Sequence, residues 1–330
     1  MRAVTLLGGL ALASVGCGGS VTAQDDGGAP DGDESGLEWP YESGLPVCRS
    51  LKEVDSCPTD GACMAVTAQG GDVLDLRMGR FRPSDPFGFT ALAGVLIDPR
   101  MNAACVNSGD ESFNWLLQID RKNGTLTTGG ARRSLDRKTF TFTTEMVSAA
   151  DLSSGCPGFV GPSTSIDLSP VTVPITFRGD TFDSGTLPRL SVPIFDPSPG
   201  VAPILLPLAD VAFTNVTLSQ GGSCIGSWDK SLWCDGDSLG WKTAGTLTGK
   251  LTLEDADHVP IKFADCASLC ALLANDGALT TKSNGHYVCK RDADGRIPDI
   301  GDANVGIGYH NAYLITATFS AYGVTIVGGR

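Results

Sequence analysis

Residues 113–127 read FNWLLQIDRKNGTLT and indicate the class of the fold. From Phe113 to Asp120 apolar side chains stand at every second position, which is the period of a β-strand with one buried face. Asn123-Gly124 is a dipeptide favoured in tight hairpin turns, and a return strand begins at Thr125. The stretch therefore predicts an antiparallel hairpin that is half-buried.

The same alternation recurs along the chain, at Phe140–Phe142, Val171–Phe177, Ile204–Phe213, Leu247–Leu253 and Tyr313–Phe319. Prolines are frequent from Pro157 to Pro207, and because proline lacks a backbone N–H, these strands are expected at sheet edges or beside bulges. Evenly spaced strands without long helical crossovers favour antiparallel pairing. We therefore expect a mainly β fold, either an antiparallel β-sandwich or an elongated two-sheet body, stapled by disulfides.

Helix signals occur mainly in one place, over about residues 253–275. Thr252 and Asp255 are spaced like an approximate capping box for a short helical turn that ends before Pro260. Asp265 is a suitable N-cap for a second helix over Cys266–Asn275, with Gly277 after its end.

The first residues are typical of an export signal. Arg2 precedes an apolar run that is too short for a transmembrane helix and ends at Ser14-Val15-Gly16-Cys17. This ending resembles a bacterial lipobox, which predicts a signal peptide over residues 1–16 and a lipid on Cys17. Ordinary cleavage after Ala23 and an uncleaved anchor are the alternatives. Lipidation is favoured because the lipid uses Cys17, which leaves ten of the eleven cysteines, an even number that can pair in disulfides.

Residues 17–44 are expected to form a disordered tether, because they contain seven acidic residues, no basic residue and little that can be buried. Residues 45–330 are expected to form a disulfide-rich β domain, with a subdivision near residue 220 as an option. The formal net charge of −13 and the absence of a basic block argue against a nucleic-acid partner. The expected attachment to a membrane is through the lipid, and Gly18 after Cys17 favours the outer membrane.

Ten cysteines in an oxidising compartment predict five disulfides. Cys266 and Cys270 are four positions apart on the expected helix, where their Cβ atoms are too far apart to bond to each other. The expected pairs are Cys224–Cys234, Cys270–Cys289 and Cys105–Cys156. A zinc site made of Cys266, Cys270, His286 and Cys289 is the alternative, although its spacing is unlike common structural zinc sites.

The segment from Cys224 to Trp241 has the composition of a carbohydrate-binding loop. Aromatic faces beside carboxylates suit sugars, because rings stack on C–H faces and acids accept hydroxyl hydrogens. The candidate ligand-binding residues are Trp228, Asp229, Trp233, Asp235, Asp237 and Trp241. The alternative is a disulfide-closed loop with tryptophans inside and charges in water.

A second loop, from Asp292 to Asp302, resembles in part the aspartate-rich calcium loops of the thrombospondin type 3 and EF-hand kinds. Its candidate calcium ligands are Asp292, Asp294, Asp299 and Asp302, with Gly295 at the turn. Arg296 within the loop and the lack of a terminal glutamate depart from those patterns, so a solvated acidic loop is the alternative. Calcium is the one cofactor that the sequence suggests.

No familiar catalytic motif is present: the sequence has no Gly-x-Ser-x-Gly elbow, no His-Glu-x-x-His pair and no Walker loop. The three histidines, His258, His286 and His310, are scattered. The sequence therefore predicts a protein that is not an enzyme, and no catalytic residue is assigned.

The cysteine-glycine-glycine signal ending, the Asp/Gly tether and the cysteine-rich β body together resemble envelope lipoproteins of myxobacterial type. Within the body, the resemblance lies in FNWLL (113–117), TLTTGG (125–130) and CIGS (224–227). It implies an outer-membrane lipoprotein, on the periplasmic side or at the cell surface, and it implies no activity. The role expected from the residues themselves is recognition or surface structure, with carbohydrate binding through the tryptophan loop as one form of it. An exported polysaccharide hydrolase and a carrier of an apolar ligand between two sheets are the alternatives.

Overall fold

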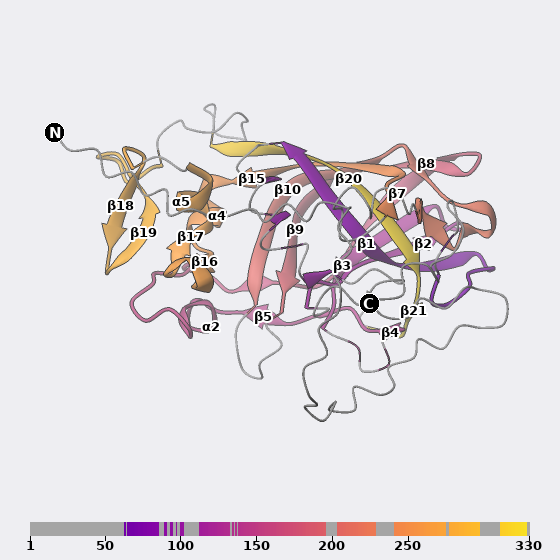
Figure 1. Cartoon of the computed structure of the whole chain (residues 1–330), viewed down its shortest axis with the longest axis horizontal. Coiled ribbons are helices and arrows are strands. Elements are labelled where there is room, and N and C mark those ends of the chain that lie inside the picture. Colours follow the sequence, from indigo (N-terminus) through magenta and orange to yellow (C-terminus); the bar gives the residue numbers. More distant parts are fainter. Residues whose placement is uncertain are drawn as a thin grey trace, which may run out of the picture.

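The structure is a computed structural model of the chain (Figure 1). It describes residues 63, 65–85, 89–90, 93–94, 97, 100–101, 112–132, 134, 136, 138–195, 203–228, 241–274, 277–297 and 311–328. The expected signal peptide, Cys17 and the tether to residue 44 lie outside the described residues.

One curled antiparallel sheet dominates the fold, in the order β11-β8-β7-β3-β2-β1-β20-β15-β10-β9, with β12 also paired to β20. Its strands are β1 Val73–Asp85, β2 Trp115–Asp120, β3 Thr125–Gly130, β7 Val171–Arg178, β8 Thr181–Ser184, β9 Leu187–Ile194, β10 Ile204–Thr214, β11 Val216–Thr217, β12 Cys224–Ile225, β15 Gly245–Thr252 and β20 Ala312–Gly323. Neighbouring strands in this sheet are antiparallel in every described pair. The predicted mainly β, antiparallel fold is confirmed.

Smaller elements surround the sheet. They are β4 Thr139–Phe140, β5 Met146–Val147, α2 Ala149–Ser153, β6 Ile166–Asp167, the 3-10 turn η3 Gln220–Gly222, β13 Ser227–Trp228, β14 Trp241–Lys242, α4 Leu253–Asp257, β16 Pro260–Ile261, the 3-10 turn η4 Lys262–Ala264, β17 Ala267–Ser268, α5 Leu269–Ala274, β18 Thr280–Ser283, β19 His286–Cys289 and β21 Thr325–Ile326. Among them, β21 and β4 form a parallel pair. None of the helices in the described part of the chain is long and apolar enough to cross a membrane.

β2 and β3 form the predicted hairpin, in register from Trp115 opposite Gly130 to Asp120 opposite Thr125. Gly124 has a φ of 64°, which glycine adopts without a Cβ clash. The expectation of a half-buried strand is wrong, because β2 is buried on both faces.

The second face of β2 is covered by β4. Arg77 of β1 lies opposite Leu116, and the ring of Phe140 lies 5.5 Å from the guanidinium carbon of Arg77. The side chain of Arg77 is itself fully buried, and its Nε donates to Oδ1 of Asn114 at 2.7 Å. An alternating pattern in one strand cannot reveal a cover that comes from another segment.

The sheet curls until its last strand, β9, returns to the hairpin. Phe113 forms an antiparallel bridge with Ile194, and a Cβ on Gly130 would lie only 2.3 Å from Cδ of Pro193. We call this line, where β9 approaches β3 and β7, the seam. The seam is closed at the end where Phe113 meets Ile194.

The inside of the curled sheet is filled by a chain of aromatic rings. The ring centroids of Trp115 lie 5.7 Å from Phe81 and 6.2 Å from Phe213, and those of Phe213 and Phe319 are 5.6 Å apart. The indole N–H of Trp115 donates to Oγ1 of Thr128 at 2.8 Å, so the polar edge of this buried ring is satisfied.

The alternating apolar residues of β10 stand at even positions up to Leu208 and at odd positions from Val211, and a bulge in the strand explains this change. A bulge separates Ala209 from Ala212 in the pairing with β15, and Asp210 within it has a φ of 50°. Lys250 donates to Oδ2 of Asp210 at 2.9 Å. The bulge therefore keeps apolar residues on the core side in both halves of the strand.

The expectation for the proline-containing strands holds for β9 but is wrong for β7, because Pro174 lies in that strand between β3 and β8. Pro188 and Pro193 are in β9, the last strand of the order, as predicted for an edge. Pro207 lies opposite Ser191 of β9, in the stretch of β10 before its pairing with β15 begins at Ala209.

The two expected helices are present but the second one is shorter than predicted. α4 begins after Thr252, whose hydroxyl accepts the N–H of Asp255, as expected. Asp265 is not an N-cap: Asp265 and Cys266 both have positive φ, and α5 begins only at Leu269. The left-handed pair makes a turn that lets β17 pair with β16 before the helix starts.

Of the expected disulfides, Cys270–Cys289 is present. The Cys224–Cys234 pairing is wrong, because Cys224 bonds to Cys63, 161 positions away. The Cys105–Cys156 pairing is also wrong, because Cys156 bonds to Cys266. Both corrections have the same reason: the fold brings distant segments together, whereas spacing favours local closures. Cys105 and Cys234 lie outside the described residues.

Cys266 and Cys270 do bond to two other cysteines, although not for the expected reason. The prediction placed both on one helix, but Cys266 precedes β17 and only Cys270 lies on α5. The sheet itself joins strands from both sides of residue 220, since β15 lies between β10 and β20. Residues 253–297 form a separate group of short elements at one end of the molecule (Figure 1).

Candidate functional site

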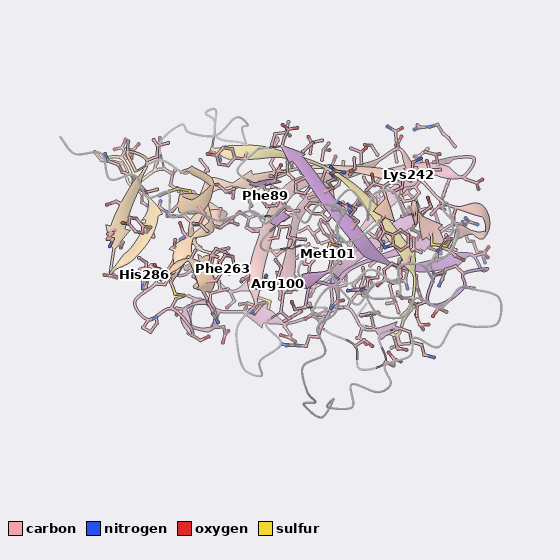
Figure 2. All side chains as sticks on the ribbon, in the orientation of Figure 1. Phe89, Arg100, Met101, Lys242, Phe263 and His286 are labelled. Atoms are coloured by element: carbon pink, nitrogen blue, oxygen red, sulfur yellow. A yellow bond between two sulfur atoms is a disulfide. The ribbon has the colours of Figure 1, made fainter. Side chains whose placement is uncertain are left out.

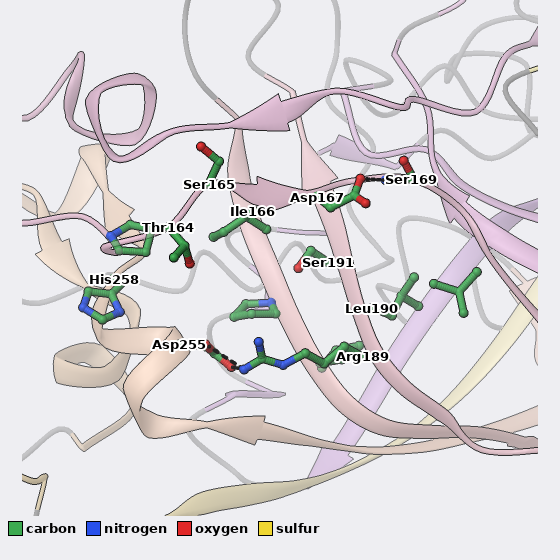
Figure 3. A pocket seen from close by; sticks show the side chains of 14 residues that line it. Thr164, Ser165, Ile166, Asp167, Ser169, Arg189, Leu190, Ser191, Asp255 and His258 are labelled. Atoms are coloured by element: carbon green, nitrogen blue, oxygen red, sulfur yellow. Dashed lines mark hydrogen bonds and ion pairs between the residues drawn. The ribbon is translucent and has the colours of Figure 1, made fainter.

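A pocket of about 400 Å³ opens along the seam, and we call it the seam pocket. It is lined by residues of the segment Pro162–Val171, by Arg189, Leu190 and Ser191 of β9, by Pro207 and Leu208 of β10, and by Asp255 and His258 at α4. Figure 3 shows the segment from Thr164 to Ser169 along one side of the pocket and Arg189 with Asp255 along the other. The pocket exists because β9 approaches the β7 side of the sheet without pairing to it.

Asp255 is placed at the pocket by the start of α4. Its backbone N–H donates to Oγ1 of Thr252 at 3.2 Å, and the Thr252 hydroxyl donates to Oδ2 of Asp255 at 2.6 Å. Nη2 of Arg189 lies 3.0 Å from the same Oδ2. The capping interaction therefore orients the carboxylate that holds Arg189 at the wall of the pocket.

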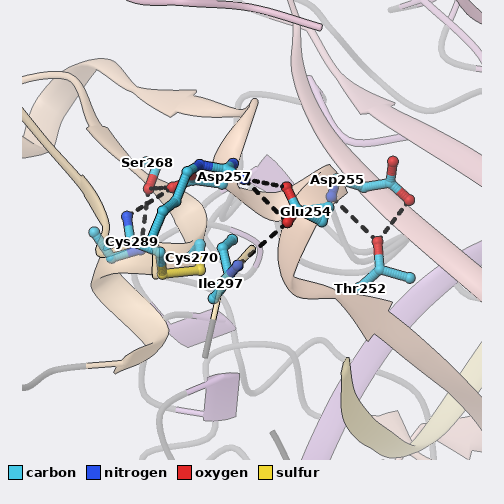
Figure 4. The surroundings of a disulfide bond; sticks show 10 residues. Thr252, Glu254, Asp255, Asp257, Ser268, Cys270, Cys289 and Ile297 are labelled. Carbon is cyan, nitrogen blue, oxygen red and sulfur yellow. Dashed lines mark hydrogen bonds and ion pairs between the residues drawn. A yellow bond between two sulfur atoms is a disulfide. The ribbon is translucent and has the colours of Figure 1, made fainter. Parts of the chain in front are cut away.

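α4 is anchored on its other side to the cysteine-rich elements (Figure 4). Arg291 bridges two acids of the helix, with nitrogen–oxygen distances of 2.8 Å to Glu254 and 3.0 Å to Asp257. Partial burial alone would lower the pKa of Arg291, but the two carboxylates outweigh it and raise that pKa. Oδ1 of the buried Asp257 accepts from Oγ of Ser268 and from the backbone N–H of Cys289, both at 2.8 Å.

Asp167 lies on the opposite wall. Oδ1 of its carboxylate accepts the backbone N–H of Ser169 at 2.8 Å. Hydrogen bonds from the side chain and the backbone of Ser169 lower the pKa of Asp167 below its ordinary value. Asp167 is therefore ionised at neutral pH.

Several other polar side chains in the pocket make no hydrogen bond within the described part of the chain. They are the hydroxyls of Thr164, Ser165 and Ser191 and the imidazole of His258, which is also the C-cap residue of α4. Ile166 and Val171, which are half-buried, provide apolar surface beside them, whereas the lining residues Leu190 and Leu208 belong to the core. Polar groups that converge on an apolar surface without internal partners are typical of a ligand site.

Trp241 is the one candidate of the predicted carbohydrate-binding loop whose side chain the structure describes, and it is not at the surface. Trp241 is 1% exposed and stacks on Tyr322, with ring centroids 5.9 Å apart and an interplanar angle of 16°. Its expected role as a surface for sugars is therefore wrong, because packing against β20 removes the ring from solvent. Trp228 pairs with Trp241 through the backbone. Asp229, Trp233, Asp235 and Asp237 lie outside the described residues.

The predicted calcium loop is held by its own backbone over the part that the structure describes. Oδ1 of Asp292 accepts the backbone N–H groups of Asp294 and Arg296, each at 2.9 Å. Asp299 and Asp302 lie outside the described residues, so calcium binding by this loop stays a prediction.

The alternative zinc site is wrong, because three of its ligands are cysteines in disulfides: Cys266 bonds to Cys156, and Cys270 bonds to Cys289. His286 lies 2.9 Å from the carbonyl oxygen of Pro157 through Nε2. Asp257 lies close to the sulfurs of Cys270 and Cys289, but bonded sulfurs are not the thiolates that zinc requires.

The structure also separates these predicted sites. His286, in the cysteine-rich group, lies at the opposite end of the molecule from Lys242, which follows Trp241 (Figure 2). The seam pocket includes none of the candidate ligand-binding or calcium residues. Two features of the sequence lie at the seam pocket, the capping pair Thr252 and Asp255 and the proline-rich strands. Neither of them indicated that a ligand binds there.

Comparison of the chain with models of protein families, with curated proteins and with solved structures found no match.

Proposed function

We propose that this chain is an exported, lipid-anchored envelope protein that binds a carbohydrate in the seam pocket. The observation that carries the proposal is the convergence of unpartnered hydroxyls, an imidazole, a guanidinium and a carboxylate on an apolar surface. A sugar presents hydroxyls around an apolar C–H face, and a pocket with both kinds of wall complements it.

Each polar group has a role that suits a polyol. The hydroxyls of Thr164, Ser165 and Ser191 can both donate and accept. Arg189 uses only Nη2 for Asp255, so its other N–H groups are available as donors. The C–H face of the sugar would pack on Ile166 and Val171.

The disulfides support export. Six described cysteines are paired in three bonds, and such bonds persist in oxidising compartments. The lipid on Cys17, the attachment to the outer membrane and the absence of a nucleic-acid partner are parts of this proposal that rest on the sequence.

Binding is favoured over hydrolysis by the state of the carboxylates. A glycosidase needs one carboxylic acid with a raised pKa to protonate the leaving group. The pKa of Asp167 is lowered by Ser169, and Asp255 is held by Arg189. Both carboxylates are therefore suited to accept hydrogen bonds.

The test is isothermal titration calorimetry of the purified protein with a panel of neutral and charged oligosaccharides. Arg189→Ala is expected to weaken binding about tenfold, the value of one charge-assisted hydrogen bond. Arg178→Ala is the matched control, because Arg178 is also an exposed strand arginine paired to an aspartate, Asp183. It lies seven residues from Val171 on β7, roughly 23 Å along the strand from the pocket.

Three results would contradict the proposal: no saturable binding to any member of the panel, an equal loss in both variants, or release of shortened products. The last result would make the hydrolase the correct function.

A further inference from the structure

The charges that line the seam pocket do not balance. Arg189 and Asp255 form an ion pair and neutralise each other. Asp167, on the opposite wall, has no cationic partner among the described residues. Asp167 therefore contributes a negative charge that no arginine or lysine of the pocket lining offsets.

The partners of the Asp167 carboxylate among the described residues are polar groups of Ser169, and none of them is cationic. A carboxylate without a cationic partner favours a cationic donor, since charge-assisted hydrogen bonds are the stronger kind. A neutral hydroxyl would satisfy its geometry but would leave the charge unbalanced.

A negatively charged ligand fits this pocket poorly. Arg189 is the one arginine or lysine in the lining, and Asp255 already neutralises it. An acidic sugar would have to displace Asp255 from Arg189 and would also face the charge of Asp167.

Resting on the proposed function, we infer that the carbohydrate carries a free amino group and that Asp167 binds its ammonium. The ligand class is therefore an amine-bearing sugar, with its hydroxyls toward Ser191 and Arg189 and its cationic nitrogen toward β6.

The experiment compares two trisaccharides that differ only at nitrogen: tri-glucosamine, with free amines, and its fully N-acetylated form. Their affinities are measured by calorimetry at low salt and at a pH where the amines are protonated. The wild type is expected to bind tri-glucosamine roughly fivefold more tightly, as suits an exposed charge pair. This preference should shrink in 0.5 M salt, since salt screens exposed charges.

Asp167→Asn is the decisive variant, because it keeps the oxygen that holds Ser169 and removes the charge. It should bind the two trisaccharides equally. Asp180→Asn makes the same change of net charge at an exposed aspartate outside the pocket lining and should keep the preference.

The outcomes separate the inference from the proposed function. Equal affinities in the wild type, or an unchanged preference in Asp167→Asn, would overturn the inference while carbohydrate binding stands. Loss of the preference in Asp180→Asn would also overturn it, because the effect would then be one of net charge. Failure of both trisaccharides and of the whole oligosaccharide panel to bind would overturn both.

Discussion

Removing the Cys63–Cys224 disulfide should cost much more stability than removing a local one. This bond closes a loop of 161 residues, whereas Cys270–Cys289 closes one of 19. The chain-entropy relation gives about 5 kcal/mol for the long loop and about 3 kcal/mol for the short one at 25 °C. The expected difference between the two double alanine variants is therefore about 2 kcal/mol.

Each bond includes one fully buried cysteine, Cys224 in one and Cys270 in the other, so the cavities left at these two positions are similar and largely cancel. The second cysteines differ, because Cys289 is buried and Cys63 is half-buried. The measurement is chemical denaturation in the absence of reductant, with the wild type and both double variants followed by tryptophan fluorescence. Peptide mapping of the unreduced protein gives the pairing directly.

The reasoning would be refuted by equal losses in the two double variants. It would also be refuted by a digest in which Cys224 is linked to Cys234. That pairing would close a ten-residue loop, worth only about 3 kcal/mol, and Cys63→Ala would then leave the Cys224 bond intact.

Three further predictions concern the core, the seam and acid stability. Thr128→Val should destabilise by about 2 kcal/mol in denaturant titrations, because the buried indole N–H of Trp115 loses its acceptor, and a loss below about 0.5 kcal/mol would contradict this. Gly130→Ala should cost about 2 kcal/mol by forcing β3 away from Pro193, and an unchanged thermal midpoint would show that the seam is not closed there. Burial raises the pKa of Asp136, but hydrogen bonds from neighbouring hydroxyl and backbone N–H groups outweigh it and hold that pKa well below its ordinary 3.8. Its stabilising contribution is therefore present above about pH 4 and lost as pH falls toward the folded pKa, so Asp136→Asn should flatten this part of a stability–pH curve.

Several strands could be predicted because their signal is local, whereas β1 and β9 were not predicted. Alternation in β2, β7 and β20 depends on a period of two residues, and the turn at Gly124 depends on one dipeptide. The same holds for the start of α4, where Thr252 and Asp255 interact within one helical turn. These features need no partner from elsewhere in the chain.

The candidate site could not be predicted, because it is made by contacts across the fold. Arg189 and Asp255 are 66 positions apart and meet only once β9 has curled back beside α4. Trp241 shows the converse: its sequence neighbours suggested a sugar-binding surface, but stacking on Tyr322 of β20 buries it.

Local sequence patterns were enough to indicate the strands with clear alternation, the turn at Gly124 and the start of α4, since each depends on neighbours within a few residues. The pairing of strands, the pairing of cysteines and the position of the pocket followed from the three-dimensional fold alone. Strand pairing and disulfides join groups that are far apart in the chain. Spacing along the sequence carries no record of which distant partner packing will bring within reach.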